Sequence, residues 1–237
     1  MLGQYQYDGV PLDLGNNYVQ ADSFSSDMAL YDRVEILRGA AGMMKGSGGT
    51  VGSVNFVRKR GTDTPHTEVT LSGGTWDNYR GQVDTGGPLN DSGTIRGRAV
   101  VAEQDRQFFY DVGKRRDQVF YGALDFDLTP DTTLGLGMAY EDVDATPCWH
   151  GLPRYRDGSS IDLKRSTCLG ASWNDWQSKR TTFFADLKHQ LNENWALKVA
   201  SVYSKNTQDI KYAFSEGTIT PGTTPSMNMY SGLFDYD

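Results

Sequence analysis

The sequence predicts a mainly β fold, with the strands of an antiparallel transmembrane β-barrel. Three observations predict it. Apolar and polar residues alternate from about residue 66 onward, short and long connections alternate between these segments, and the segments have the length of a tilted membrane strand. A hydropathy average does not detect such a barrel, because its apolar residues occupy every second position.

The composition argues against several other classes of protein. With 237 residues the chain is long enough for one core, and its 30 Asp+Glu against 23 Lys+Arg argue against a general nucleic-acid binder. No stretch approaches the ~20 consecutive apolar residues of a membrane-spanning helix. The 27 glycines and the 12% of aromatic residues are too many for a disordered acidic chain.

Period-two alternation places the strands. In one segment Phe120, Leu124 and Phe126 share a face, opposite to Asp125 and Asp127. The same count predicts strands at 67–73, 79–89, 95–102, 120–128, 134–141, 181–191 and 195–204, with 227–237 as a candidate eighth.

The connections favour a barrel over a soluble sheet. Tight turns of favoured turn residues are expected at 90–92, 129–131 and 192–194, and long segments at about 105–116, 142–178 and 205–226. Every second connection is then short, so the short turns share one edge of the sheet and the long loops the other, as in outer-membrane barrels. A soluble β-rich repeat protein is the alternative.

The glycine-rich run from Gly39 to Gly52 does not fit a nucleotide-binding loop. A P-loop requires Gly-Lys-Ser/Thr, whereas Lys45 precedes Gly46, and a dinucleotide fingerprint requires glycine where Val51 stands. The histidines, His66, His150 and His189, lie far apart without metal-ligand spacing. We therefore expect no enzyme activity, no cofactor and no protein-bound metal.

The two cysteines, Cys148 and Cys168, fall within one long connection. An even count in one exposed loop predicts a disulfide and an oxidising compartment, with two free thiols as the alternative. Aromatic residues surround the pair: Trp149, Tyr155, Trp173 and Trp176. They predict either a rigid apolar surface for a ligand or a small core of the loop itself.

Four stretches of the first sixty residues, 8–11, 29–39, 42–48 and 54–60, resemble the plug domain of TonB-dependent ferric-siderophore receptors in order and spacing. Pro-Cys-Trp, Gly-Leu-Pro and Ser-Thr-Cys-Leu-Gly-Ala elements of the long connection are similar to the hydroxamate-siderophore branch, the receptors for coprogen-like and pyoverdine-like ligands.

The resemblance implies a domain division. Residues 1–61 are expected to form the C-terminal half of an α+β plug domain, and residues 66–237 the first seven or eight of about 22 barrel strands. We therefore expect this chain to be a fragment or truncated form of a longer receptor. The polar strand faces are expected to point toward the plug and the water around it; they carry Arg96, Arg98, Asp125, Asp127 and Asp186.

The resemblance also implies a function. A receptor of this kind lies in the outer membrane of a Gram-negative bacterium, contacts its lipid, binds a ferric siderophore and imports it with energy from TonB–ExbB–ExbD. Iron travels inside the siderophore, so no protein metal ligand or cofactor is needed, and no nucleic acid takes part. The same fold importing cobalamin, haem or an oligosaccharide, and a non-functional remnant, are the alternatives.

Site residues follow from the resemblance by position. Arg33, Glu35 and Arg38 are expected to lock the plug to barrel carboxylates. Ligand contacts are expected at the plug apices and on the aromatic loop: Leu14, Asn16, Asn17, Tyr18, Lys45, Trp149, Tyr155, Trp173 and Trp176. Lys45 stands where the family commonly has tyrosine, so it would offer a positive charge instead of a phenol.

Overall fold

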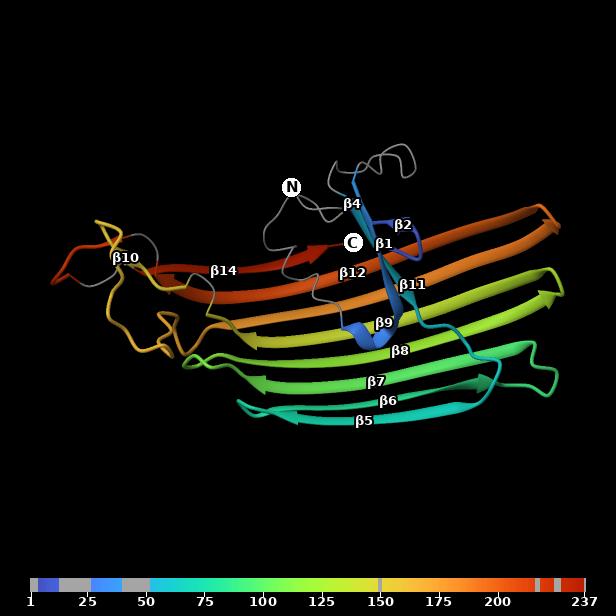
Figure 1. Cartoon of the computed structure of the whole chain (residues 1–237), viewed down its shortest axis with the longest axis horizontal. Coiled ribbons are helices and arrows are strands. Elements are labelled where there is room, and N and C mark those ends of the chain that lie inside the picture. Colours follow the sequence, from blue (N-terminus) through green and yellow to red (C-terminus); the bar gives the residue numbers. More distant parts are fainter. Residues whose placement is uncertain are drawn as a thin grey trace.

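The computed structural model describes residues 4–12, 27–39, 52–148, 151–215, 218–223 and 227–236. In these residues the chain forms an eight-stranded sheet, a four-stranded sheet that stands on its inner face, and a two-stranded pair at the loop edge (Figure 1). None of the helices found there is long and apolar enough to cross a membrane. The predicted mainly β fold is confirmed.

The eight-stranded sheet is antiparallel throughout, with the order β14-β12-β11-β9-β8-β7-β6-β5. Its strands are β5 (His66–Gly74), β6 (Asn78–Pro88), β7 (Ile95–Gln107), β8 (Lys114–Thr129), β9 (Thr132–Thr146), β11 (Asp175–Asn192), β12 (Trp195–Ser215) and β14 (Met227–Tyr236). Within the described residues β5 and β14 are its two edges, so the sheet is a wall that does not close into a barrel.

All eight predicted strands exist, but five of them extend at least five residues further toward the loop edge than alternation indicated. For example, β8 begins at Lys114 instead of residue 120. Its residues 114–118 are nearly all charged, and Arg115 pairs with Asp117 on the same strand. A segment that is polar on both faces carries no period-two signal, so sequence patterning missed this part.

The two faces of the wall differ as alternation requires. The row Val83, Val101, Phe120 and Tyr140 pairs across β6 to β9 and points away from the small sheet, with all but the half-buried Tyr140 exposed. The opposite, inner face buries charged and polar residues: Asp84, Asp125, Glu141, Ser178, Arg180, Thr182 and Asp186.

Short turns gather at one edge of the wall, on the right in Figure 1, where residues 89–94, 130–131 and 193–194 connect successive strands. The prediction that the other edge has only long loops is wrong in two places. Residues 108–113 form a loop there that is no longer than the connection at 89–94. Residues 75–77 close a three-residue turn there, which Trp76 and Asp77 permit by adopting positive φ angles of 60° and 49°.

The small sheet has the order β2-β1-β4-β3. It comprises β1 (Gln4–Tyr7), β2 (Val10–Pro11), β3 (Tyr31–Arg38) and β4 (Gly52–Arg58), and the 3-10 helix η1 (Met28–Leu30) leads into β3. The hairpin from β1 to β2 turns on Asp8-Gly9, whose φ angles of 51° and 88° suit the two-residue turn for which Asp-Gly is favoured.

One apolar core joins the two sheets. It contains Tyr7, Ala29, Leu30 and Tyr31 from the small sheet and η1, and Val100, Ala102, Val119, Tyr121, Ala123, Ala139 and Phe184 from the wall. Tyr7 meets Phe184 edge to face, with ring centroids 5.8 Å apart. The small sheet is therefore packed against the wall and crosses its inner face (Figure 1).

Candidate functional site

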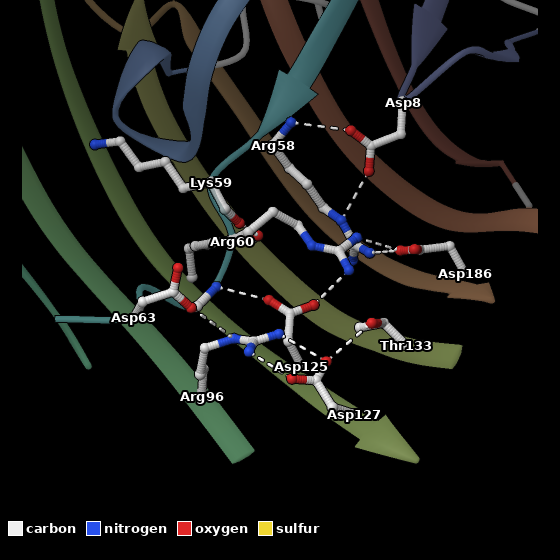
Figure 2. Close-up of polar contacts among 12 residues, drawn as sticks. Asp8, Arg58, Lys59, Arg60, Asp63, Arg96, Asp125, Asp127, Thr133 and Asp186 are labelled. Carbon is white, nitrogen blue, oxygen red and sulfur yellow. Dashed lines mark hydrogen bonds and ion pairs between the residues drawn. The ribbon is translucent and has the colours of Figure 1, made fainter. Parts of the chain in front are cut away.

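Three consecutive cations, Arg58, Lys59 and Arg60, leave the end of β4 and reach carboxylates on the inner face of the wall. Figure 2 shows these contacts for the two arginines. We call the three cations and their partners the inner ion network. Its centre is Arg58, which is only 2% exposed. The Arg58 guanidinium pairs with Asp186 of β11, and its Nε lies 2.7 Å from Oδ2 of Asp8.

Asp8 therefore has two tasks. It makes the hairpin turn, and its carboxylate accepts from the backbone N–H of Arg58 at 3.1 Å while it pairs with the guanidinium. The Nζ of Lys198 on β12 donates to the carbonyl oxygen of Asp8 at 2.8 Å. The tip of the hairpin is thus fixed both to the end of β4 and to the wall.

Lys59 reaches the opposite side of the network. Its Nζ lies 2.7 Å from Oδ2 of Asp84 on β6. Asp84 also accepts two hydrogen bonds from Arg98 of β7, at 2.8 and 2.7 Å, and Nε2 of His66 lies 3.6 Å from it. One buried carboxylate thus serves several basic groups, which keeps it compensated away from water.

Arg60 bridges two strands of the wall. It pairs with Asp125 of β8 and with Asp186 of β11, the latter at 2.5 Å, and the backbone N–H of Gly61 donates to Asp125 at 2.8 Å. Figure 2 shows Arg58 and Arg60 converging on Asp186 from the same side. The end of the small sheet is therefore bound to β6, β8 and β11 within three residues of chain.

Two glycines of β9 make room for these arginines. A Cβ on Gly137 would lie 2.5 Å from Nη1 of Arg58, and one on Gly135 would lie 2.8 Å from Oδ1 of Asp186 and against the Arg60 guanidinium. Any larger residue on this stretch of the inner face would occupy the space of the guanidinium groups. The alternation of glycine with Leu134, Leu136 and Met138 thus leaves space for the guanidinium groups on the inner face and an apolar outer face.

A second ionic contact lies nearer the loop edge. The Asp27 carboxylate accepts hydrogen bonds from Arg80 of β6 at 2.7 and 2.8 Å and from the N–H of Ala29 at 2.8 Å. Burial alone would raise the pKa of Asp27, but the hydrogen bonds from Arg80 and Ala29 outweigh it, and the pKa falls below its ordinary 3.8. Asp27 thus caps η1 and ties it to the wall.

Two of the residues expected to lock plug to barrel, Arg33 and Glu35, line a hollow together with Arg58 and Arg60. Arg33 is exposed and pairs with Asp32 at 3.0 Å and with Glu35 at 2.9 Å, both on its own strand, and Glu35 also accepts from Asn55 of β4. Arg38 is exposed as well. The expected role of Arg33, Glu35 and Arg38 as a lock between plug and barrel stays a prediction.

Sequence reasoning assigned no role to Arg58, Lys59 and Arg60. Their signal was visible: a run of three cations stands where the small sheet ends, and single aspartates alternate onto the inner faces of later strands. What patterning alone could not supply is the pairing, because it depends on which strands stand opposite the end of β4.

Six of the expected ligand contacts lie outside the described residues: Leu14, Asn16, Asn17, Tyr18, Lys45 and Trp149. The structure places the other three apart. Tyr155 is half-buried in β10 (Arg154–Tyr155), which pairs in parallel with β13 (Thr218–Ile219). Trp173 is 43% exposed, and the ammonium group of the outward-pointing Lys211 lies over its ring. Trp176, in contrast, is buried on the inner face.

Trp176 belongs to a hollow of about 130 Å³ at the loop edge of the inner face. We call it the aromatic hollow. Its lining comes from three segments and includes Phe108, Tyr110, Lys114, Arg115, Pro147 and Trp176. Tyr110 and Phe108 stack with ring centroids 5.1 Å apart, and Trp176 stacks on Tyr212 at 6.1 Å. Burial raises the pKa of Tyr110, against a smaller opposite effect of the Arg106 charge.

The aromatic hollow can hold a small planar group. Aromatic rings line it, two cations stand at its rim, and its volume is comparable with cavities that accept a single ring. In the described residues no cluster of three or more His, Cys, Asp or Glu could hold a metal ion.

A disulfide joins Cys148 to Cys168 beside this hollow, with the two Cα atoms 5.9 Å apart. Asn174, also buried, ties the loop to its neighbours: its Nδ2 donates to the carbonyl oxygens of Pro147 and Ala213, and its Oδ1 accepts from the N–H of Ala213 at 2.7 Å. The long connection is thus anchored at both ends.

Residues 3–53 match the family model described as the TonB-dependent Receptor Plug Domain. That match covers most of the small sheet and ends before Arg58. The match therefore identifies the small sheet as part of a plug domain, and it does not depend on the strands of the wall.

Curated relatives match both sheets. The "Ferric-pyoverdine M114 receptor PbuA" of Pseudomonas sp. (strain M114) is 73% identical over 238 residues, which cover 100% of this chain and 29% of the relative. The "Ferripyoverdine receptor" of Pseudomonas aeruginosa PAO1 is 42% identical over 201 residues, which cover 84% of this chain and 25% of the relative.

A solved structure of P. aeruginosa FpvA bound to heterologous pyoverdines matches with a TM-score of 0.89 at 38% identity. The match covers 98% of this chain and 32% of that one. This chain therefore spans less than a third of the length of these relatives.

Proposed function

Because the chain belongs to the TonB-dependent ferric-siderophore receptors, we propose that it is part of an outer-membrane transporter that imports a ferric siderophore of the pyoverdine class. In this proposal residues 1–61 form the second half of the plug, and residues 66–237 form the first part of the barrel wall. Its partners are the ferric siderophore, the TonB–ExbB–ExbD complex and the lipid of the outer membrane.

The observation that carries the proposal is the inner ion network. A sheet that plugs a wide barrel must be held inside it and must also be able to move when cargo passes. Charge-assisted pairs such as Arg58–Asp186 and Lys59–Asp84 hold firmly in a partly dry lumen, and unlike an interlocked apolar core they can exchange for water.

The outer face of the wall supports a place in the membrane. Its apolar side chains, among them Leu71, Phe120, Phe183 and Val199, are exposed over several neighbouring strands. Exposed apolar surface of this extent is unfavourable in water, whereas in a bilayer it meets hydrocarbon.

The aromatic hollow is our proposed contact for the cargo. It opens at the loop edge on the inner face, where a ligand arriving between the loops and the plug would meet it. Lys114 adds positive charge for an anionic complex, and Trp176 and Tyr110 offer flat apolar surfaces. It holds one planar group of a siderophore rather than the whole molecule.

The test uses a hybrid receptor, in which this chain replaces the matching 29% of the M114 receptor. The hybrid is expressed in a Pseudomonas strain without its own ferric-pyoverdine receptors, and uptake of radiolabelled iron is measured. We expect uptake with iron-loaded M114 pyoverdine, and none in an isogenic strain that lacks TonB.

The unmodified M114 receptor is the positive control. A hybrid that reaches the outer membrane but takes up no ferric pyoverdine, while the control does, would overturn the proposal. Uptake of cobalamin or haem in place of the siderophore would assign a different cargo to the same fold.

A further inference from the structure

The aromatic hollow depends on a short loop whose conformation is not self-sufficient. Residues 108–113 connect β7 to β8 and supply two of its rings, Phe108 and Tyr110. Val112 has a φ of 61°, a left-handed conformation that β-branched residues rarely adopt. Tyr110 lies over Gly113, where a Cβ would be 2.7 Å from its Cδ2. Something outside the loop must hold it in this form.

The long connection between β9 and β11, which carries the disulfide, makes the contacts that hold the 108–113 loop. The N–H of Asp111 donates to the carbonyl oxygen of Ser166 at 2.7 Å, and the Ser166 hydroxyl donates to Oδ2 of Asp111 at 3.4 Å. The Arg165 guanidinium lies over the ring of Phe109, 5.2 Å from its centroid. Phe109 in turn meets Trp76 and Tyr110 edge to face at 6.4 and 5.2 Å.

The disulfide fixes where these contacts are made. Ser166 stands two residues before Cys168, so its position follows from the cross-link to Cys148 at the end of β9. The route from the disulfide to the hollow is short: Cys168, then Ser166 and Arg165, then the 108–113 loop, then Tyr110.

We propose that Arg165 and Ser166 form a latch, anchored by the disulfide, that positions Tyr110 and Phe108 for the planar group of the siderophore. This rests on the proposed function. Arg165 and Ser166 are positioning residues, because neither lines the hollow. The latch preorganises the binding surface, so its loss should weaken binding chiefly through faster dissociation.

The experiment measures the dissociation constant and dissociation rate of iron-loaded M114 pyoverdine on the purified hybrid receptor. Arg165→Ala should raise the Kd about two- to fivefold, as expected for a cation–π contact. Arg165→Lys keeps a cation over Phe109 and should recover part of the affinity. Arg156→Ala, which removes the same charge from an exposed place on the same connection, is the matched control and should leave the Kd unchanged.

A double-mutant cycle separates positioning from a general effect on folding. In a Tyr110→Ala background only Phe108 is left for the latch to position, so Arg165→Ala should change the Kd by less than it does in the parent. Replacing both cysteines by serine should reproduce the loss seen with Arg165→Ala. Heat-modifiable mobility on gels checks that each variant is folded.

The outcomes are distinct. No binding by the unmodified hybrid overturns the proposed function and the latch with it. Binding that survives Arg165→Ala unchanged overturns the latch alone. An equal loss in the parent and in the Tyr110→Ala background also overturns it, because the effect would then not pass through Tyr110.

Discussion

Arg58 is the residue on which the docking of the small sheet depends most. A guanidinium that is almost fully buried is tolerated only when carboxylates compensate it and when space is kept for it. Asp8 and Asp186 supply the charge, and Gly137 supplies the space. Removing either carboxylate would leave a buried cation that is only partly compensated, at a cost of up to about 3–5 kcal/mol.

Gly137→Ala tests the space directly. Its methyl group would meet Nη1 of Arg58, so we expect the plug to be held less firmly, by about 1–3 kcal/mol. The measurement is the urea concentration at which residues 1–61 of the hybrid receptor become accessible to protease while the barrel stays heat-modifiable.

Gly122→Ala is the matched control, because a Cβ on Gly122, on the neighbouring strand β8, has no atom within 4 Å. It should leave the urea midpoint unchanged or raise it slightly. Equal midpoints for the two variants would contradict the role assigned to Gly137.

For single residues, the sequence predicted which face of the wall a side chain lies on, but not its partner in the plug. Alternation placed Asp125 and Asp186 on the polar face, and both lie there, buried beneath the small sheet. It could not predict their partners. Arg58 and Asp186 are 128 residues apart in sequence, and only the crossing of β4 over β11 brings them together.

At the scale of the elements, the attachment of η1 to the wall responds to acid. The pKa of Asp27 is lowered in the folded protein, so its ionised form stabilises the fold. That contribution is complete above the ordinary value of 3.8 and is lost as the pH falls below it, through the lowered pKa of the folded state.

Asp27→Asn should therefore lower the urea midpoint for plug release at neutral pH, and the difference from the parent should shrink as the pH falls toward about 3. Comparing the two proteins removes the titration of other carboxylates. A difference that stays constant over this range would show that the Asp27 charge contributes nothing to docking.

Strand existence was predictable, and strand ends were not. The apolar middle of each strand is visible in the sequence, because apolar residues face outward there and polar residues face the small sheet. Toward the loop edge the inward residues can be polar as well, so the hydropathy pattern weakens although pairing continues. In β12, for example, the inward Asn206 and Gln208 are buried. Likewise the cysteine count predicted a cross-link, but not that Ser166 would meet Asp111.

For the whole molecule, the open edges of the wall are decisive. β5 and β14 each leave one side unpaired within the described residues, and an unpaired strand edge tends to associate with other strands. We expect these 237 residues, expressed by themselves, neither to insert stably into liposomes as a monomer nor to transport iron.

The measurement is flotation of the refolded chain with liposomes, followed by cross-linking to count copies. The hybrid receptor, in which the remaining strands are supplied, should float as a monomer under the same conditions. Stable monomeric insertion of the 237-residue chain would contradict this expectation.

The inner ion network lies close to the point where the peptide chain passes from the small sheet into the wall. Arg58 is eight residues before His66, the first residue of β5, so even a fully extended chain lets it travel no more than about 28 Å from the root of that strand. The short linker between Arg58 and His66 therefore keeps β4 near the wall. A pulling force that breaks the ion pairs can move β4 aside but cannot carry it far from the wall. Once the force stops, the same short linker would bring Arg58 back to Asp186.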